Sequence, residues 1–313
     1  MGAWRRRSAW IPEAGFDGTS CRTLIRSGLM TRRALHFLWN RVEITRPHNL
    51  AVAALVILAG WAAAGGGPPD ATLAWALVAG VLVAAAGNVV NDTFDADIDR
   101  INKPRRPIPS GRLSRAECRR YYGGLAAASL VAAALAGPPM LVVAVLWHLL
   151  LYAYSAVLKG SFLLGNVAVA VVCSSGFVAG AWLAGRPGVA WLPMLLAFFL
   201  LMGREIVKDV EDLPGDGACG ATTLARRLGA RRALGVALIF FLLFTALGPS
   251  PYWLRLVGPS YLLVFFGAVL PLLFLATLLM FRDTSPGNLV RVSWILKLDM
   301  FVGVLGFYLG QAR

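Results

Sequence analysis

Long apolar segments of similar length are the feature that most constrains the fold of this 313-residue chain. A helix needs roughly 20 apolar residues to cross a bilayer. Nine segments come close to that length: residues 49–66, 71–92, 117–136, 138–158, 162–184, 189–211, 231–248, 257–281 and 290–310. Because helices satisfy their own backbone hydrogen bonds in lipid, this pattern predicts an all-α polytopic membrane protein with about nine transmembrane helices.

Composition excludes an ordinary soluble domain. Hydrophobic residues make up 58% of the chain, charged residues 15%, and the mean hydropathy is +0.67. Soluble domains carry about a quarter charged residues. Short stretches such as "GGGPPD", "AGPP", "AGRPG" and "GPSP" separate several of the apolar segments, and their Gly and Pro residues are typical of loops.

The basic residues are distributed unevenly along the predicted topology. All but three of the 30 Lys and Arg residues lie on the side of the N-terminus, and the exceptions are Arg186, Arg255 and Arg313. The positive-inside rule therefore predicts a multi-pass protein of the cell membrane with a cytoplasmic N-terminus. We interpret the net charge of +14 as a reflection of topology and of contact with anionic membrane lipid. It does not indicate nucleic-acid binding, and no obligate protein partner is evident.

The chain before the first apolar segment is Arg-rich and lacks the apolar core of a secretory signal. We expect residues 1–40 to form a disordered basic tail and residues 41–313 to form the membrane domain. The sequence leaves open whether Met1 or Met30 is the true start.

The cysteines and histidines do not indicate a zinc site or a disulfide framework. Cys21, Cys118, Cys173 and Cys219 show no CxxC or other ligand spacing, and the three histidines are scattered.

Two acidic motifs with identical spacing follow the second and sixth apolar segments. The first is Asp92-x-x-Asp95-x-x-x-Asp99 after Asn91, and the second is Asp209-x-x-Asp212-x-x-x-Asp216 after Lys208. A single motif of this kind fits a solvated helix end equally well. Two matched copies on the same side of the membrane favour a functional site, because ionisable residues at the edge of a membrane are usually functional.

Helical geometry brings the acids of each motif together. At about 100° per residue, Asn91 shares one face with the three aspartates of the first motif, while Asp97 lies on the far side. In the second motif Glu205 and Lys208 share a face with Asp209 and Asp212, while Glu211 points away. We expect Pro214 and Gly215 to end that helix, so that Asp216 reaches the site from a turn.

Clustered carboxylates stay ionised only when a cation holds them. Oxygen ligands without His or Cys favour Mg²⁺ over zinc, and Mg²⁺ usually keeps phosphate oxygens as further ligands. A diphosphate bridged by Mg²⁺ between the two motifs is therefore the expected occupant.

Basic residues near the motifs are candidates for contact with an anionic ligand. "RINKPRRPIPSGRLS" places Arg100 and Arg105 directly after the first motif, although topology alone explains most of these cations. Lys159 is the only cation across residues 121–185 and lies at the cytoplasmic end of its segment. Tyr154 fits core packing or a role in the site equally well. Arg46 and Asn49 lie at the N-terminal end of the first segment, and we interpret His48 as a residue of the membrane interface.

These motifs together resemble the UbiA superfamily of intramembrane prenyltransferases. The resemblance rests on "TRPHN", "NDTFDADID", "KPRRPIPSG", "YSAVLKG" and "KDVEDLPGD" with "GATTLARRLG", and it covers roughly residues 40–313. It implies nine helices around a central cavity with a lateral opening to lipid. It also implies Mg²⁺ as cofactor, a polyprenyl diphosphate as donor and a lipophilic acceptor.

The resemblance assigns roles to individual residues. The metal ligands would be Asn91, Asp92, Asp95, Asp99, Asp212 and Asp216. Catalysis would depend on Asp92, Asp95, Asp212 and Lys159. Together with the positions of the basic and polar residues described above, the resemblance leads us to expect substrate contacts from Asn49, Asn91, Arg100, Arg105, Tyr154, Lys208 and Asp209.

Within the superfamily, "GREIVKDVEDLPGD" and "DIDRINKPRRPIPSG" look most like the transferases that attach geranylgeranyl to geranylgeranylglyceryl phosphate in ether-lipid synthesis. An aromatic acceptor such as 4-hydroxybenzoate or homogentisate is the alternative. A cation-coupled transporter is the alternative outside enzymes, although both acidic motifs lie at one membrane edge and do not mark a path through it. A CDP-alcohol phosphotransferase is disfavoured because its D-G-x-x-A-R pattern is missing.

Overall fold

The computed structural model describes residues 37–218 and 220–311. The chain divides into two compact units, residues 1–41 and 42–313. Only residues 37–41 of the first unit are described, and they are helical. Most of the predicted basic tail, the choice between Met1 and Met30, Cys21 and Cys219 therefore lie outside the described residues.

The described part of residues 42–313 contains helices and no strands. The helices of the first half are α2 (Pro47–Ala63), α3 (Ala71–Phe94), α4 (Ala96–Asn102), α5 (Arg115–Ala136), α6 (Pro138–Ala153), η1 (Tyr154–Leu158), α7 (Leu164–Ser174) and α8 (Gly176–Leu183). Those of the second half are η2 (Pro187–Ala190), α9 (Trp191–Glu211), α10 (Leu213–Ala218), α11 (Leu224–Leu228), α12 (Ala230–Leu247), α13 (Ser250–Trp253), α14 (Pro259–Val264), η3 (Phe265–Val269), α15 (Leu270–Arg282) and α16 (Pro286–Leu309).

Every predicted apolar segment coincides with one helix or with a run of consecutive helices. Within the described residues, seven helices are long and apolar enough to cross a membrane, or eight if the bent pair 37–45 and 47–63 is one span. Charged residues in the first turns of α5 keep it below that threshold. The predicted all-α membrane fold is confirmed, and the count of nine spans is approximate.

Small residues allow the helices to pack closely without a polar core. A Cβ added at Gly60 of α2 would lie 2.0 Å from the carbonyl oxygen of Phe177, and one at Gly180 of α8 would lie 1.9 Å from that of Ile57. Such close contact between backbones is typical of helices that associate in lipid, where van der Waals packing replaces the hydrophobic effect.

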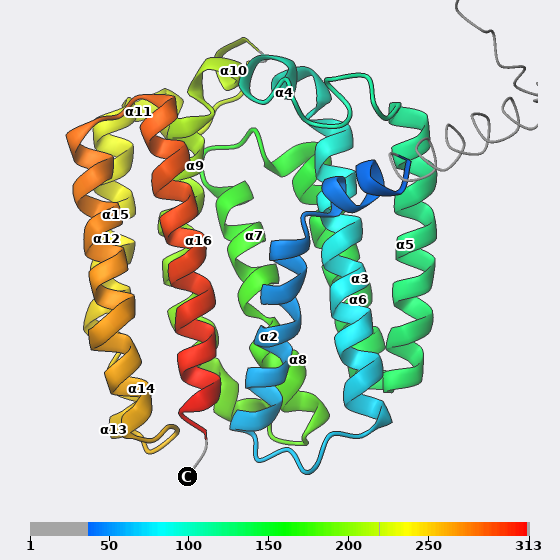
Figure 1. The fold of residues 1–313 in the computed structure, drawn as a ribbon, viewed down its shortest axis with the longest axis vertical. Helices are drawn as coiled ribbons and strands as arrows, with labels where there is room; N and C mark the ends of the chain where they lie inside the picture. The colour runs from blue at the N-terminus through cyan, green and yellow to red at the C-terminus, as the bar shows by residue number, and fades with distance from the viewer. Residues whose placement is uncertain (1–36, 219, 312–313) are drawn as a thin grey trace, which may run out of the picture. The chain divides into compact units, whose positions relative to one another are not determined.

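The two acidic motifs lie on broken helices at one end of the bundle. The α3 helix ends at Phe94 and α4 begins at Ala96, while α9 ends at Glu211 and α10 follows at once. Figure 1 shows α4 and α10 beside each other at this end, next to α11. The expectation that Pro214 and Gly215 end the second helix was wrong, because both lie inside α10. Proline is tolerated in the first turn of a helix, where its missing N–H has no intrahelical partner.

Candidate active site

A cavity of about 830 Å³ lies between α2, α3, α6, α9 and α16. Charged and polar side chains line it near the end that carries α4 and α10, among them Asp92 and Lys208. Apolar residues such as Ile57, Val83 and Leu151 line the rest. The cavity therefore offers one polar region for an anionic headgroup and an apolar region for a hydrocarbon chain.

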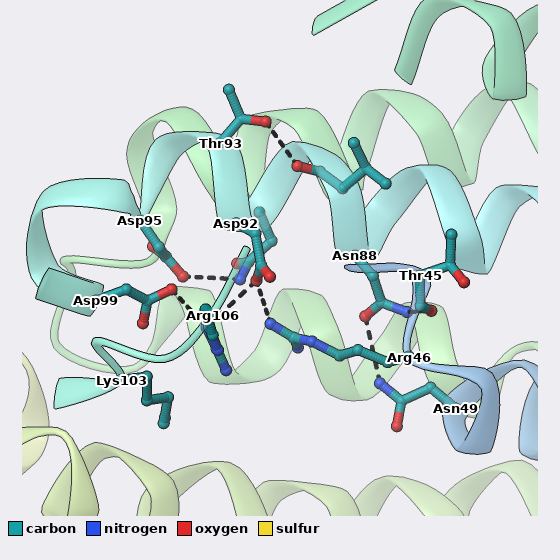
Figure 2. Close-up of polar contacts among 12 residues, drawn as sticks. Thr45, Arg46, Asn49, Asn88, Asp92, Thr93, Asp95, Asp99, Lys103 and Arg106 are labelled. Carbon is teal, nitrogen blue, oxygen red and sulfur yellow. Dashed lines mark hydrogen bonds and ion pairs between the residues drawn. The ribbon is translucent and has the colours of Figure 1, made fainter. Parts of the chain in front are cut away.

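The three carboxylates of the first motif are buried, and arginines hold two of them, Asp92 and Asp99. Asp92, Asp95 and Asp99 are each less than 5% exposed. Arg46 forms an ion pair with Asp92, while Arg106 lies 3.3 Å from Asp92 Oδ1 and 2.6 Å from Asp99 Oδ2. Figure 2 shows both guanidinium groups pointing at Asp92. Buried carboxylates need such partners, because an unpaired buried charge is strongly destabilising.

Asp95 faces a different set of partners. Lys159 forms an ion pair with it, and Asn91 Nδ2 donates a hydrogen bond to its Oδ2 at 2.7 Å. The Lys159 N–H donates to Tyr154 O at 2.9 Å, because a π-helical turn ends α6 and leads to this lysine. Such turns are frequent at functional sites. Asn91 Oδ1 is buried and has no hydrogen-bond partner among the described residues.

The second motif is joined to the first through Lys103. Its Nζ lies 2.7 Å from Asp212 Oδ1 and 3.3 Å from Glu211 Oε1. Glu211 also accepts a hydrogen bond of 2.7 Å from Ser293 Oγ of α16. The expectation that Glu211 points away from the site was wrong, since it lines the cavity. Asp212 and Glu211 follow one another in the chain, and the end of α9 at Glu211 lets both approach one ammonium.

The remaining predicted residues of the second motif lie along α9 and α10. Lys208 lines the cavity 3.2 Å from Glu205 Oε2. Asp209 accepts a hydrogen bond of 2.8 Å from Asn166 Nδ2 of α7. The Asp216 carboxylate is buried and has no ion pair among the described residues.

The titratable groups at this end of the bundle differ in how their surroundings shift their pKa values. Burial and then the neighbouring Asp212 raise the pKa of Asp216 to about 6. Burial alone would raise the pKa of Asp212, but Lys103 and Lys208 lower it overall. Burial opposes the charge of Lys159, yet Asp95 raises the pKa of this lysine. The site thus holds Asp212 and Lys159 in their charged forms, while burial and the nearby Asp212 disfavour the charge of Asp216.

The structure does not bring every predicted residue to the site. The Arg100 side chain is 70% exposed and lies 3.1 Å from Asp97 on the outer face of α4. Arg105 is also exposed. Asn49 and Tyr154 do line the cavity. Arg106 is one of the cations that contact the aspartates instead. It lies next to Arg105 in "KPRRPIPSG", and the sequence alone did not distinguish these two arginines.

The donor set fits Mg²⁺ in its chemistry. Within the described residues, no three His, Cys, Asp or Glu side chains are close enough together to hold a metal. The carboxylates that face cations use one oxygen each: Asp92 Oδ1, Asp95 Oδ2, Asp99 Oδ2 and Asp212 Oδ1. Asn91 Oδ1, buried without a hydrogen-bond partner among the described residues, is a further oxygen beside them. These are the hard oxygen donors that Mg²⁺ prefers.

Comparison with known families gives the context for this geometry. Residues 52–301 match the model of the UbiA prenyltransferase family. The chain belongs to the UbiA prenyltransferase family. It is therefore a prenyltransferase and a multi-pass membrane protein, as the sequence motifs and apolar helices predict.

Several relatives are named digeranylgeranylglyceryl phosphate synthase. A digeranylgeranylglyceryl phosphate synthase of Methanopyrus kandleri is 39% identical over 266 residues, which cover 85% of this chain and 97% of the relative. The protein of that name from Hyperthermus butylicus is 36% identical over 302 residues and is covered to 99% of its length. The predicted family is confirmed.

Solved structures share the fold. A structure of digeranylgeranylglyceryl phosphate synthase is 29% identical, with a TM-score of 0.68 over 88% of this chain and 98% of the other. A UbiA homologue from Aeropyrum pernix K1 has a TM-score of 0.72 at 18% identity, over 83% of this chain and 96% of the other. A homologue from Archaeoglobus fulgidus, solved with GPP and Mg²⁺, has a TM-score of 0.59 at 21% identity, over 86% and 99%.

Proposed function

We propose that the chain transfers a geranylgeranyl group from its diphosphate to the free hydroxyl of geranylgeranylglyceryl phosphate, and that the transfer depends on Mg²⁺. The observation that carries the proposal is the pairing of both acidic motifs with cations at the polar end of one largely apolar cavity. The names of the relatives support the choice of acceptor.

In this proposal the two motifs share the donor diphosphate. Mg²⁺ would be held by Asn91, Asp92, Asp95, Asp99, Asp212 and Asp216. Bound Mg²⁺ supplies Lewis-acid stabilisation of the diphosphate charge. Lys159 and Lys208 approach the same region as the aspartates and would contact diphosphate oxygens. Arg106 and Lys103 fill the role that the sequence suggested for Arg100 and Arg105, because their side chains lie beside the acids.

The chemistry is an alkyl transfer with a diphosphate leaving group. The bond between C1 of the prenyl chain and the bridging oxygen breaks while negative charge grows on the diphosphate. Lys159 and Lys208 stabilise that charge in a site of low dielectric. The acceptor hydroxyl oxygen forms the new bond to C1, and its proton passes to the departing diphosphate. Apolar walls such as Val83, Leu151 and Ile57 keep water from the allylic carbon during the reaction.

Tyr154 and Asn49 would position the substrates. Tyr154 is 7% exposed and lines the cavity from η1, the turn that leads to Lys159. Asn49 Nδ2 donates to Asn88 Oδ1 at 3.3 Å at the N-terminal end of α2. Asp209 would act indirectly, through its bond to Asn166. The distribution of basic residues supports a location in the cell membrane with both motifs on the cytoplasmic side.

Transfer assays with defined acceptors test the proposal. The full chain in lipid vesicles is incubated with labelled geranylgeranyl diphosphate and either geranylgeranylglyceryl phosphate or 4-hydroxybenzoate. We expect a labelled ether lipid that forms only with Mg²⁺ present, and no such product from Asp92→Asn. A product from the aromatic acceptor alone would overturn the choice of acceptor. Cation uptake by the vesicles without any prenyl transfer would instead favour a transporter.

A further inference from the structure

We propose that Arg204, Lys297 and His48 form a separate subsite that binds the phosphate group of the acceptor. This inference rests on the proposed function and deepens it, because it names the part of the cavity that selects a phosphorylated acceptor. The three residues come from α9, α16 and α2, and all of them line the cavity. None of them belongs to the acidic motifs.

The side chains on α2 and α16 are in direct contact. Lys297 Nζ lies 3.5 Å from His48 Nε2. The same ammonium lies 4.1 Å from the centre of the Trp294 ring, and that ring lies 5.2 Å from the His48 ring. A cation over an aromatic face is attracted to it but keeps its hydrogen-bond donors available. Lys297 is thus positioned by its neighbours with donors left for a ligand.

Lys297 differs from the other lysines of the cavity in having no carboxylate partner in the described part of the chain. Among the described residues, no carboxylate oxygen lies within 4.0 Å of Lys297 Nζ, whereas Lys103 and Lys159 each have such a partner. The charged groups near Lys297 include the cations Arg204 and Arg46 and the carboxylate of Glu211. Adjacent positive charges in a half-buried site repel each other, and a bound anion would relieve that repulsion.

Arg204 also has a donor to spare. It forms an ion pair with Glu205 through its NH1 group. Its Nε is buried and has no hydrogen-bond partner among the described residues. A buried donor without a partner costs free energy, so a native structure normally provides one. A phosphate oxygen near Lys297 would be such a partner, since a guanidinium can bind phosphate through two of its N–H groups.

The subsite lies next to the region proposed for the donor diphosphate. Arg204 and Lys208 are four residues apart on α9, so they lie on one face with a separation of about 6 Å along the axis. Glu205 contacts both side chains. In a glyceryl phosphate, the carbon bearing the phosphate is adjacent to the carbon whose hydroxyl attacks. A phosphate held by Arg204 and Lys297 therefore keeps that hydroxyl within a few atoms of the donor carbon.

The charge and the acceptor oxygens of a phosphate suit this subsite. A phosphate monoester carries about −1.5 to −2 charges at pH 7 and has three acceptor oxygens. Arg204 shares Glu205 with Lys208, and Lys297 has no carboxylate partner among the described residues, so a phosphate offers these cations more charge and more acceptor oxygens than a singly charged aromatic carboxylate. Apolar residues of the same helices, such as Val52, Leu298 and Phe301, also line the cavity and suit the prenyl chain of the acceptor. The expected ligand is therefore a phosphorylated lipid alcohol.

Kinetics with two acceptors test the subsite in the full chain, reconstituted in vesicles of neutral phosphatidylcholine. We expect Lys297→Met and Arg204→Gln to raise the KM for geranylgeranylglyceryl phosphate about 10- to 100-fold, the effect of losing a charged hydrogen bond. The KM for geranylgeranyl diphosphate should stay within about twofold. With dephosphorylated geranylgeranylglycerol, the wild type should be poor and Lys297→Met should cause no further loss.

Two comparisons make the result specific to this site. Arg291→Met removes an exposed cation from the same helix and should leave both KM values unchanged. Lys297→Arg should keep most of the acceptor affinity that Lys297→Met loses.

Repeating the assay with phosphatidylglycerol in the vesicles tests for occupation by a lipid headgroup. An acceptor KM that rises with that lipid in the wild type but not in Lys297→Met is expected if the subsite recognises phosphate. A rise of the same size in both proteins would overturn the assignment of Lys297.

Glycerol phosphate offers a test that needs no variant. We expect it to inhibit the wild type competitively against the acceptor and not against geranylgeranyl diphosphate. Competition against the donor alone, or equal losses with both acceptors in Lys297→Met, would overturn the subsite while leaving prenyl transfer intact. Failure of the wild type to transfer to any glyceryl acceptor would instead overturn the proposed function, and the subsite with it.

Discussion

The side chain of Asn102 binds the backbone of Gly215 at the point where the two acidic motifs meet. Asn102 Oδ1 accepts a hydrogen bond of 2.9 Å from the Gly215 N–H, and its Nδ2 donates one of 2.9 Å to the Asp212 carbonyl oxygen. One amide thus connects the end of α4 to the start of α10. Since Asn102 and Asp212 are 110 residues apart in the chain, the relative position of the two motifs depends on such contacts.

Gly215→Ala should separate the two motifs. A Cβ at residue 215 would lie 2.4 Å from Asn102 Nδ2, so the amide or α10 must move. We expect a loss of stability of about 1–3 kcal/mol, as for other overpacked sites, together with a lower rate of transfer. Thermal unfolding in detergent and initial rates in vesicles measure both effects. Gly217→Ala is the matched control, because nothing lies within 4 Å of its added Cβ; equal effects of the two substitutions would contradict the role of this contact.

Asp95→Asn should remove most of the transfer activity. The substitution leaves Lys159 without its carboxylate and removes a proposed metal ligand. Loss of one preorganised electrostatic contact typically lowers kcat about 10²- to 10³-fold. Asp97→Asn changes an exposed aspartate two residues away, whose ion-pair partners among the described residues are the exposed Arg100 and the partly exposed Arg115. Its activity should stay within about twofold of the wild type. A comparable loss in both variants would argue against the assignment.

Arg106→Met should destabilise the protein more than Arg105→Met does. Arg106 lies within ion-pair distance of both Asp92 and Asp99. Its removal leaves Asp99 without that partner, and breaking a buried pair costs about 3–5 kcal/mol. Arg106→Lys should recover only part of the loss, because an ammonium lacks the planar fork that reaches two carboxylates. Melting temperatures of the three variants in one detergent provide the measurement, and an unchanged value for Arg106→Met would contradict the expectation.

Mg²⁺ should raise the melting temperature of the purified protein in the absence of substrate. A ligand that binds only the folded state at 100 times its Kd stabilises it by about 2.7 kcal/mol. We expect Asp216→Asn to reduce this shift, since it removes a buried carboxylate that has no ion pair among the described residues. Asp283→Asn removes an exposed carboxylate and should retain the full shift. A shift of equal size in both variants would exclude Asp216 as a ligand.

The local geometry of the first motif was largely predictable, whereas its partners were not. A period of 3.6 residues places Asp92, Asp95 and Asp99 on one face, and the structure buries all three. Helical periodicity could not distinguish Arg105 from Arg106, because both lie in the loop between α4 and α5, which is not a regular helix. Only the folded loop turns one arginine toward Asp92 and the other toward solvent.

Glu211 shows the same limit for the second motif. If the helix continued past Glu211, this side chain would point away from the neighbouring acids, but α9 ends at this residue. The end of the helix and the contact with Ser293 of α16 bring Glu211 into the cavity. Both causes depend on parts of the chain that are distant in sequence.

The sequence by itself determined the membrane class of the protein, its helical content and the two acidic motifs. These properties follow from hydropathy over about 20 residues and from helical periodicity, which are local in the chain. Tertiary structure alone decided which cation faces which carboxylate, that Asn102 binds Gly215, and that Lys297 of α16 lies beside His48 of α2. Contacts between distant segments depend on how whole helices pack, and no local pattern of residues encodes that packing.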